Sequence, residues 1–345
     1  MILRIVQKFD KIGRYYKINT LLYTMEGTIT ASTPQPSFAE RLKNYVDFAR
    51  PFTLVAPMLG IISGGITAWG AAPVTSFHWS IVFSILAGGL MAAMLNVASN
   101  GINQVFDLPI DRINKPSRPI PSGKMSIREA WAVSLAAYVV AWILAWVVVP
   151  YGTAEHSCFW IVLITSVLTY VYSGPPFRTK RHGILANLTI AIPRGMLLKV
   201  AGWSSVKTIF GLEPWYIGAI FGLFLLGASS TKDFSDMKGD AADGCRTLPI
   251  VYGPKKAAWM ISPFFVLPFM LIPAGVYFNI LTGNRILLYA LGCVLILYGI
   301  YTVYTMVRRP EELATDSNHI SWTHMYRMVF VGQVGFALAY LVELF

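Results

Sequence analysis

The sequence predicts an all-α, multi-pass membrane protein, with about nine transmembrane helices around one central cavity. Of its 345 residues, 55% are hydrophobic and 13% are charged, whereas about 25% are charged in a soluble domain. The chain also contains nine apolar runs of roughly 18 residues or more, the length that crosses a bilayer. Lys and Arg gather in alternate loops between these runs, as expected of a membrane protein with a fixed orientation.

The apolar runs follow one another along most of the chain. They cover residues 52–72, 79–102, 126–149, 157–173, 184–202, 213–231, 257–278, 286–306 and 323–344. We therefore predict a basic N-terminal tail, 1–36, and a transmembrane domain, 37–345. An interfacial helix over 37–50 is expected to lead into the first run, with Ser37 as its cap and Glu40 three residues later.

The tail has two interpretations. Its apolar residues fit one face of a short amphipathic helix on an anionic membrane surface, and a disordered tail fits equally well. The tail lacks a signal peptide's order of basic start, apolar core and small-residue cleavage site.

The net charge of +11 does not predict a nucleic-acid partner, because the basic residues follow the membrane topology. They concentrate in the tail and in the loops after the second, fourth, sixth and eighth runs, and the opposite loops hold only Lys207 and Arg285. By the positive-inside rule, the basic end and the N-terminus are cytoplasmic.

A polar stretch, NQVFDLPID, ends the second apolar run. Asn103, Asp107 and Asp111 are four residues apart, which places them on one face of a helix. Carboxylates at the end of a membrane helix are costly, and Mg²⁺, which takes oxygen ligands and phosphate, would stabilise them. Pro109 predicts that the helix kinks or ends there. The alternative is a solvated helix end.

A second acidic stretch, KDFSDMKGD, follows the sixth apolar run. Asp233, Asp236 and Asp240 stand at i, i+3 and i+7, again one helical face. Both stretches fall on the predicted cytoplasmic side, so we expect them to oppose each other across a cavity and to hold a diphosphate through Mg²⁺. A charged cytoplasmic loop is the alternative for the second stretch alone.

Basic residues beside these stretches are candidates for holding a diphosphate. They are Arg50, Arg118, Arg178, Lys180 and Arg181. Cations of this kind stabilise the negative charge that develops on a leaving group. The alternatives are topological charge and interfacial anchoring. Arg194 and Lys199, within the fifth apolar run, are weaker candidates that are expected to face the bundle interior.

These motifs resemble those of the UbiA-type intramembrane prenyltransferase superfamily. The resemblance rests on NQVFDLPID, YSGPPFRTKRHG and KDFSDMKGD, with RPIPSG and RTLPIVYG in support, and extends from about residue 40 to the end. It implies transfer of a polyprenyl group from its diphosphate to a lipid-soluble or amphipathic acceptor. It also implies Mg²⁺ on Asn103, Asp107, Asp111, Asp236 and Asp240, with Asp233 in support, and a diphosphate gripped by Arg50, Arg178 and Lys180.

Within this resemblance, the predicted catalytic residues are Asp107, Asp111 and Lys180, with Asp111 a candidate proton acceptor. Gln104 departs from the family pattern, which often has aspartate there, and it leaves the acceptor open. The branches that this sequence resembles are digeranylgeranylglyceryl phosphate synthases, chlorophyll synthases and homogentisate prenyltransferases. Two rival hypotheses are a terpene cyclase on the same scaffold and a transporter, although no internal repeat supports transport.

Overall fold

The computed structural model describes residues 37–315 and 317–345. The chain divides into two units, Met1–Lys43 and Asn44–Phe345. Helix α2 (Phe38–Ala49) begins in the first unit, where the Ser37 amide donates to Glu40 Oε2 at 2.7 Å and the Glu40 amide donates to Ser37 Oγ at 3.3 Å. This capping box confirms the predicted helix start. The predicted tail, 1–36, lies outside the described residues, so the division at residue 37 stays a prediction.

The second unit consists of helices joined by loops, and no β-strand occurs among the described residues. Its elements are α3 (Phe52–Gly70), α4 (Trp79–Phe106), α5 (Leu108–Asn114), α6 (Ile127–Val147), α7 (Ser157–Ser173), η1 (Thr179–Arg181), α8 (Ile184–Ala191), η2 (Ile192–Leu197), α9 (Leu198–Trp203), α10 (Leu212–Ala228), η3 (Ser229–Thr231), α11 (Asp233–Ala242), α12 (Leu248–Ile261), η4 (Ser262–Phe265), α13 (Leu267–Tyr277), α14 (Arg285–Arg308), η5 (Pro310–Glu312), α15 (Ile320–Leu341) and η6 (Val342–Leu344).

The membrane-spanning pattern agrees with the predicted one. In the described chain, eight helical segments are long and apolar enough to cross a bilayer, and α7 is a shorter apolar helix of 17 residues. These nine segments correspond one by one to the nine apolar runs. The chain is therefore an all-α, multi-pass integral membrane protein.

Two of the spans are interrupted helices. The fifth passes from α8 through a π-helical turn, η2, into α9. The seventh begins at Leu248, earlier than the predicted residue 257, and bends at Gly253, which has a φ of 77°. Proline explains both interruptions, because Pro193 and Pro254 lack the N–H that would continue the helical hydrogen bonds.

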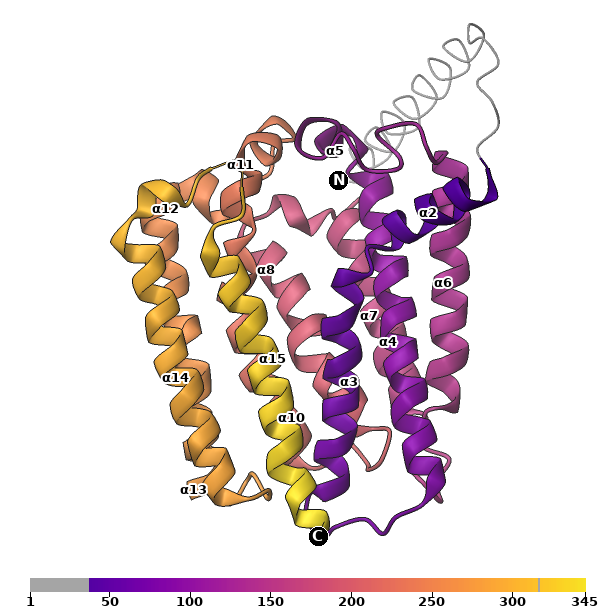
Figure 1. The fold of residues 1–345 in the computed structure, drawn as a ribbon, viewed down its shortest axis with the longest axis vertical. Coiled ribbons are helices and arrows are strands. Elements are labelled where there is room, and N and C mark those ends of the chain that lie inside the picture. Colours follow the sequence, from indigo (N-terminus) through magenta and orange to yellow (C-terminus); the bar gives the residue numbers. More distant parts are fainter. Residues whose placement is uncertain (1–36, 316) are drawn as a thin grey trace, which may run out of the picture. The chain divides into compact units, whose positions relative to one another are not determined.

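Because successive spans reverse direction, the connecting loops gather at two ends of the second unit. Figure 1 shows α5 and α11 at one end, and the lower end of α13 at the other. The loop elements α5, η1 and α11 all follow spans that run toward the same end. The predicted acidic and basic stretches therefore meet at one end of the bundle.

Small residues let α3 lie very close to its neighbours. A Cβ on Gly64 would lie 2.9 Å from the Lys199 carbonyl oxygen, and a Cβ on Gly70 would lie 2.0 Å from the Tyr340 carbonyl oxygen. Neither position has room for a side chain. Close backbone approach of this kind replaces the hydrophobic effect as the source of helix association in lipid.

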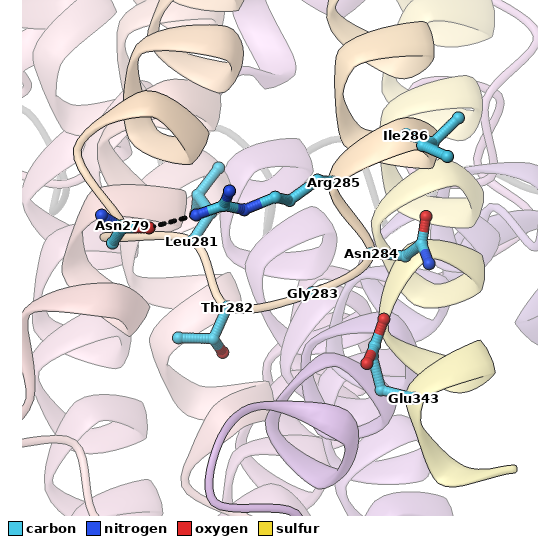
Figure 2. Close-up of a pocket in the computed structure, with 8 residues that line it drawn as sticks. All are labelled: Asn279, Leu281, Thr282, Gly283, Asn284, Arg285, Ile286 and Glu343. Atoms are coloured by element: carbon cyan, nitrogen blue, oxygen red, sulfur yellow. Dashed lines mark hydrogen bonds between the residues drawn. The ribbon is translucent and has the colours of Figure 1, made fainter.

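A pocket of about 570 Å³ opens at the end of the bundle opposite α5 and α11. Figure 2 shows its lining, which comes from the loop between α13 and α14, the first turn of α14 and Glu343. None of the predicted site residues lines it. The predicted central cavity is not this pocket, and it stays a prediction.

Candidate active site

The first acidic stretch is divided between two helices. Helix α4 ends at Phe106, and Asp107 stands between α4 and α5 with φ −93° and ψ 8°. The predicted break at Pro109 is confirmed, because the proline occupies the first turn of α5, where its missing N–H costs nothing. Asp111 lies beyond this break, in α5, so it belongs to a bent segment and not to a straight continuation of α4, as the predicted kink implies.

Basic side chains neutralise this first stretch. Lys180 Nζ pairs with Asp107 Oδ1, and Arg118 Nη1 donates to both carboxylate oxygens of Asp111, at 2.7 and 2.6 Å. Burial raises the pKa of Asp111, while the Arg118 charge acts in the opposite direction. Asn103, also predicted as a ligand, lies in the last turn of α4 and is partly exposed.

The second acidic stretch lies on one helix, as predicted. Helix α11 begins at Asp233 and carries Asp236 and Asp240. Asp236 Oδ1 lies 2.7 Å from Lys232 Nζ and 3.5 Å from Lys115 Nζ. Burial and the neighbouring carboxylates raise the pKa of Asp233 well above its usual range and that of Asp240 to about 7. The protein's own cations do not neutralise this helix fully.

The helices that carry the two stretches are in contact, and the prediction that the stretches face each other across a cavity stays a prediction. Asn114, at the end of α5, donates from Nδ2 to the Asp236 carbonyl oxygen at 3.5 Å. Gly239 permits this approach, because a Cβ there would lie 2.3 Å from Asn114 Nδ2. Asp107 and Lys180 also act electrostatically on Asp240. Residues more than 100 positions apart in the sequence thus form one charged cluster.

The basic loop between α7 and α8 lies against this cluster. Arg178 has a left-handed backbone with a φ of 42°, and its Nη2 donates to the Phe106 carbonyl oxygen and to Asp243 Oδ2, both at 3.1 Å. Arg181 donates to the same carboxylate from Nε at 3.1 Å and from Nη2 at 2.7 Å. Asp243 therefore holds two of the predicted diphosphate ligands.

Asp243 was absent from the sequence-based candidates. Two features of the sequence point to it. The chain has only 17 acidic residues, and Asp243 follows Asp240 by three positions, which is one helical turn. Lys115 and Lys232 were also missed as site residues, because the positive-inside pattern explains them equally well.

A series of three amide side chains on α4 holds the junction between α2 and α3. Asn96 Nδ2 donates to the Thr53 carbonyl oxygen at 3.0 Å, and Asn100 Nδ2 donates to the Ala49 carbonyl oxygen at 3.2 Å. These amides and Gln104 are four residues apart, so they share one face of α4. We call Asn96, Asn100 and Gln104 the amide ladder.

Gln104 is the lowest-exposure member of the amide ladder, with 1% of its surface accessible. Its Nε2 donates to the Phe48 carbonyl oxygen at 2.9 Å. An aspartate cannot make this contact, because an ionised carboxylate has no hydrogen to donate. The departure from the family pattern at this position therefore has a structural role in this chain.

The amide ladder surrounds Arg50, another predicted diphosphate ligand. Arg50 has a φ of 57°, a left-handed conformation that costs a non-glycine residue about 1–3 kcal/mol. The carbonyls of Phe48, Ala49 and Thr53, on both sides of it, are held by the ladder. Burial, then the nearby charges of Arg118 and Arg194, lower the pKa of Arg50 to about 10.

The donor set fits Mg²⁺ in its chemistry. The candidate ligands offer only carboxylate and amide oxygens, which this hard cation prefers. Burial and acidic neighbours raise the pKa values of Asp233 and Asp240, and a bound cation would stabilise their ionised forms. Within the described residues, no three side chains of His, Cys, Asp or Glu are grouped as metal ligands. Mg²⁺ commonly takes only one or two carboxylates and completes its shell with phosphate and water.

Comparison with known proteins identifies the family. The model of the UbiA prenyltransferase family matches residues 58–325. The digeranylgeranylglyceryl phosphate synthase of Methanobrevibacter smithii is 29% identical over 257 residues, which cover 74% of this chain and 85% of that protein. The chloroplastic chlorophyll synthase of Arabidopsis thaliana is 32% identical over 202 residues, 55% of this chain and 50% of that protein.

Solved structures support the same fold. A UbiA homologue from Archaeoglobus fulgidus, whose structure was solved with GPP and Mg²⁺, is 19% identical, has a TM-score of 0.65, and covers 87% of this chain and 99% of that one. At this identity, the likeness concerns the fold alone. Together with the family match over most of the chain, it leads to one conclusion: the protein belongs to the UbiA prenyltransferase family and is a membrane-embedded prenyltransferase.

Proposed function

We propose that this enzyme transfers a polyprenyl group, of the geranylgeranyl type, from its diphosphate to a lipid or aromatic acceptor, with Mg²⁺ as cofactor and release of diphosphate. Such a reaction belongs to lipid, quinone or pigment biosynthesis. One observation carries the proposal: α5 and α11 bring two acidic stretches together, and the basic loop after α7 contacts the first of them. The solved homologue with GPP and Mg²⁺ supports a prenyl diphosphate as the donor and Mg²⁺ as the cofactor.

Each proposed site residue has a role in binding the donor. The proposed metal ligands are Asn103, Asp107, Asp111, Asp233, Asp236 and Asp240. The proposed diphosphate ligands are Arg50, Arg118, Arg178, Lys180 and Arg181. Bound Mg²⁺ would supply positive charge to the diphosphate oxygens. In the protein without ligands, Lys180, Arg118 and Lys232 occupy the carboxylates, so these cations are free to turn toward the diphosphate once the carboxylates bind metal.

The chemistry follows from this arrangement of charge. The bond between prenyl C1 and the diphosphate oxygen breaks, and its electron pair leaves with the diphosphate. Arg178 and Lys180 stabilise the negative charge that develops on the leaving group. The surrounding apolar helices exclude water, which would otherwise capture the allylic cation. The acceptor then forms its new bond to C1 and loses a proton, for which the carboxylate oxygen of Asp111 that does not bind metal is our candidate acceptor once Arg118 turns to the diphosphate.

We also propose that the site and the N-terminus face the cytoplasm. The loops at the end that carries α5, η1 and α11 hold most of the loop Lys and Arg residues, whereas Lys207 and Arg285 are the basic residues in the opposite loops. This asymmetry supports a cytoplasmic location for the basic end. Cysteine-labelling of each end in sealed vesicles tests the orientation.

The decisive experiment measures diphosphate release from geranylgeranyl diphosphate by the purified protein in detergent. The acceptors are geranylgeranylglyceryl phosphate, homogentisate, 4-hydroxybenzoate and chlorophyllide, each with Mg²⁺ or EDTA. We expect release that needs Mg²⁺ and one acceptor, and that is lost in Asp107→Asn and Asp236→Asn. Folded protein that releases no diphosphate with any acceptor or donor length contradicts the proposal, and release without any acceptor would indicate a cyclase.

A further inference from the structure

Arg194 is a charged residue at membrane depth that the proposed diphosphate site does not use. It lies in the π-helical turn η2, in the middle of the span from Ile184 to Trp203. Its side chain is exposed, although its neighbours in sequence, Pro193 and Gly195, are buried. Arg194 Nη2 donates to Asn96 Oδ1 at 3.2 Å. This contact places the guanidinium against α4, beside a buried amide.

The Arg194–Asn96 pair lies deeper in the bundle than the acidic stretches. Asn96 precedes Asp107 by eleven residues on α4, which corresponds to about 16 Å along the helix axis. The proposed diphosphate ligands of the basic loop, Arg178 and Lys180, contact the other end of that interval, at Phe106 and Asp107. The pair therefore lies about three turns of α4 away from the proposed diphosphate ligands.

The guanidinium of Arg194 lacks a counter-ion in the described part of the chain, where no carboxylate forms an ion pair with it. A cation at membrane depth is costly unless it is paired. The nearby buried cation, Lys199, differs: its Nζ donates to Ser63 Oγ at 2.9 Å and lies 4.5 Å from the centre of the Phe221 ring. Lys199 is satisfied inside the protein, and Arg194 is not.

Arg194 lies within electrostatic range of a second cation and of a tyrosine that adjoins the acidic residues. Arg194 acts electrostatically on Arg50, a second cation. It also acts on Tyr172, whose side chain lies within electrostatic range of Asp233, Asp107 and Asp240. Two arginines at the border of the charged cluster, with unused donors on Arg194, form a place for an anion.

We propose that Arg194, positioned by Asn96, binds the anionic group of the acceptor, a phosphate monoester or a carboxylate. This inference rests on the proposed function and adds the chemical class of the acceptor. A guanidinium presents a rigid fork of donors that matches either group through two hydrogen bonds. With its anion held below the reacting carbon, the acceptor's nucleophile is directed toward prenyl C1.

The test compares acceptors that differ only in charge. Geranylgeranylglyceryl phosphate is paired with geranylgeranylglycerol, and homogentisate with its methyl ester, in the wild type, Arg194→Gln and Arg194→Lys. We expect Arg194→Gln to raise the KM for whichever charged acceptor is used by about 10-fold to 100-fold. The KM for the matching neutral acceptor should change by less than 2-fold, and the KM for the donor should stay constant. Arg194→Lys should recover part of the lost affinity for the charged acceptor. Arg285→Gln, an exposed arginine at the opposite end, serves as the control.

Two results would overturn the inference. One is an equal loss for the charged and neutral acceptors, and the other is a rise in the donor KM, which would make Arg194 a diphosphate ligand. A direct measurement separates this inference from the proposed function: equilibrium binding of labelled geranylgeranylglyceryl phosphate and homogentisate without donor. If the wild type turns over no acceptor, the proposed function fails. Loss of binding specific to Arg194→Gln still supports the anion site, and unchanged binding refutes it.

Discussion

The two acidic stretches differ in how the protein treats their charge. In the first, each carboxylate has a basic partner, Lys180 for Asp107 and Arg118 for Asp111. In the second, Lys232 and Lys115 pair with Asp236, while Asp233 and Asp240 form no ion pair within the described residues. Their pKa values are raised by burial and by their acidic neighbours. Basic side chains neutralise one side of the site, and the other side keeps two carboxylates without an ion pair in the described part of the chain.

This difference indicates which carboxylates are neutralised by basic side chains and which would be neutralised by a bound metal. A buried carboxylate without a partner is destabilised as an ion, and a bound divalent cation reverses that cost. The Mg²⁺ affinity should therefore depend more on α11 than on α5. The basic residues paired with the first stretch are the ones that the diphosphate can recruit.

The largest effect should come from Asp240→Asn. We expect kcat/KM to fall by about 10²-fold to 10³-fold, the scale of losing one preorganised electrostatic group, and the Mg²⁺ concentration for half-maximal activity to rise. Asp111→Asn should raise that Mg²⁺ concentration less, because Asp111 is already paired with Arg118. Mg²⁺ titrations of both variants measure the difference. Glu311→Gln, an exposed acid in the loop before α15, is the control. If Asp240→Asn and Asp111→Asn raised the required Mg²⁺ concentration equally, the two acidic stretches would not differ in their dependence on metal.

The next effect should come from Asp243→Asn. This carboxylate holds both Arg178 and Arg181, so its neutralisation frees two cations of the basic loop. We expect a fall in kcat/KM for the donor of about 10-fold to 100-fold, since hydrogen bonds to charged groups contribute about 1.5–3 kcal/mol. Glu312→Gln, which breaks the exposed pair with Arg309, is the control and should leave both the stability and the donor kcat/KM almost unchanged, because exposed pairs contribute little. A loss of stability without any change in donor kinetics would show that Asp243 only supports the fold.

Gln104→Glu tests the amide ladder behind the first stretch. The substitution removes the donor to the Phe48 carbonyl in a fully buried position, at a cost of about 1–3 kcal/mol in the free energy of unfolding. We expect the donor KM to rise several-fold because Arg50 is displaced. A double-mutant cycle with Arg50→Gln measures the coupling. Additive effects on the donor KM would mean that Gln104 does not act through Arg50.

The smallest effect should come from Gly239→Ala, which acts on the contact between the two stretches. The added methyl would overlap Asn114, a short side chain that can turn away. We expect activity to fall only a few-fold, with a rise in the Mg²⁺ concentration needed and a loss of stability of about 1 kcal/mol. Thermal unfolding and Mg²⁺ titration measure the two effects. Gly211→Ala, whose Cβ would meet only Pro214 Cδ at 4.0 Å, is the matched control.

Much of the fold follows from local sequence. Runs of apolar residues of bilayer length predict spans because the lipid interior permits only regular, internally bonded backbone. The break at Pro109 follows from the missing N–H of proline, and the capping box at Ser37 from side-chain reach over three residues. The bends at Gly253 and in η2 were not predicted, since a proline or glycine within an apolar run is also found in continuous membrane helices.

The sequence by itself determined the all-α membrane class, the spans, the two acidic stretches and the family. Only the tertiary structure decided which charges meet. Lys180 reaches Asp107 from 73 positions away, and Gln104 reaches the Phe48 carbonyl from 56 positions away. The role of Asp243 and the open guanidinium of Arg194 are also invisible in a linear pattern. Span length is set by local contact with the lipid, whereas these pairings depend on how helices distant in sequence pack.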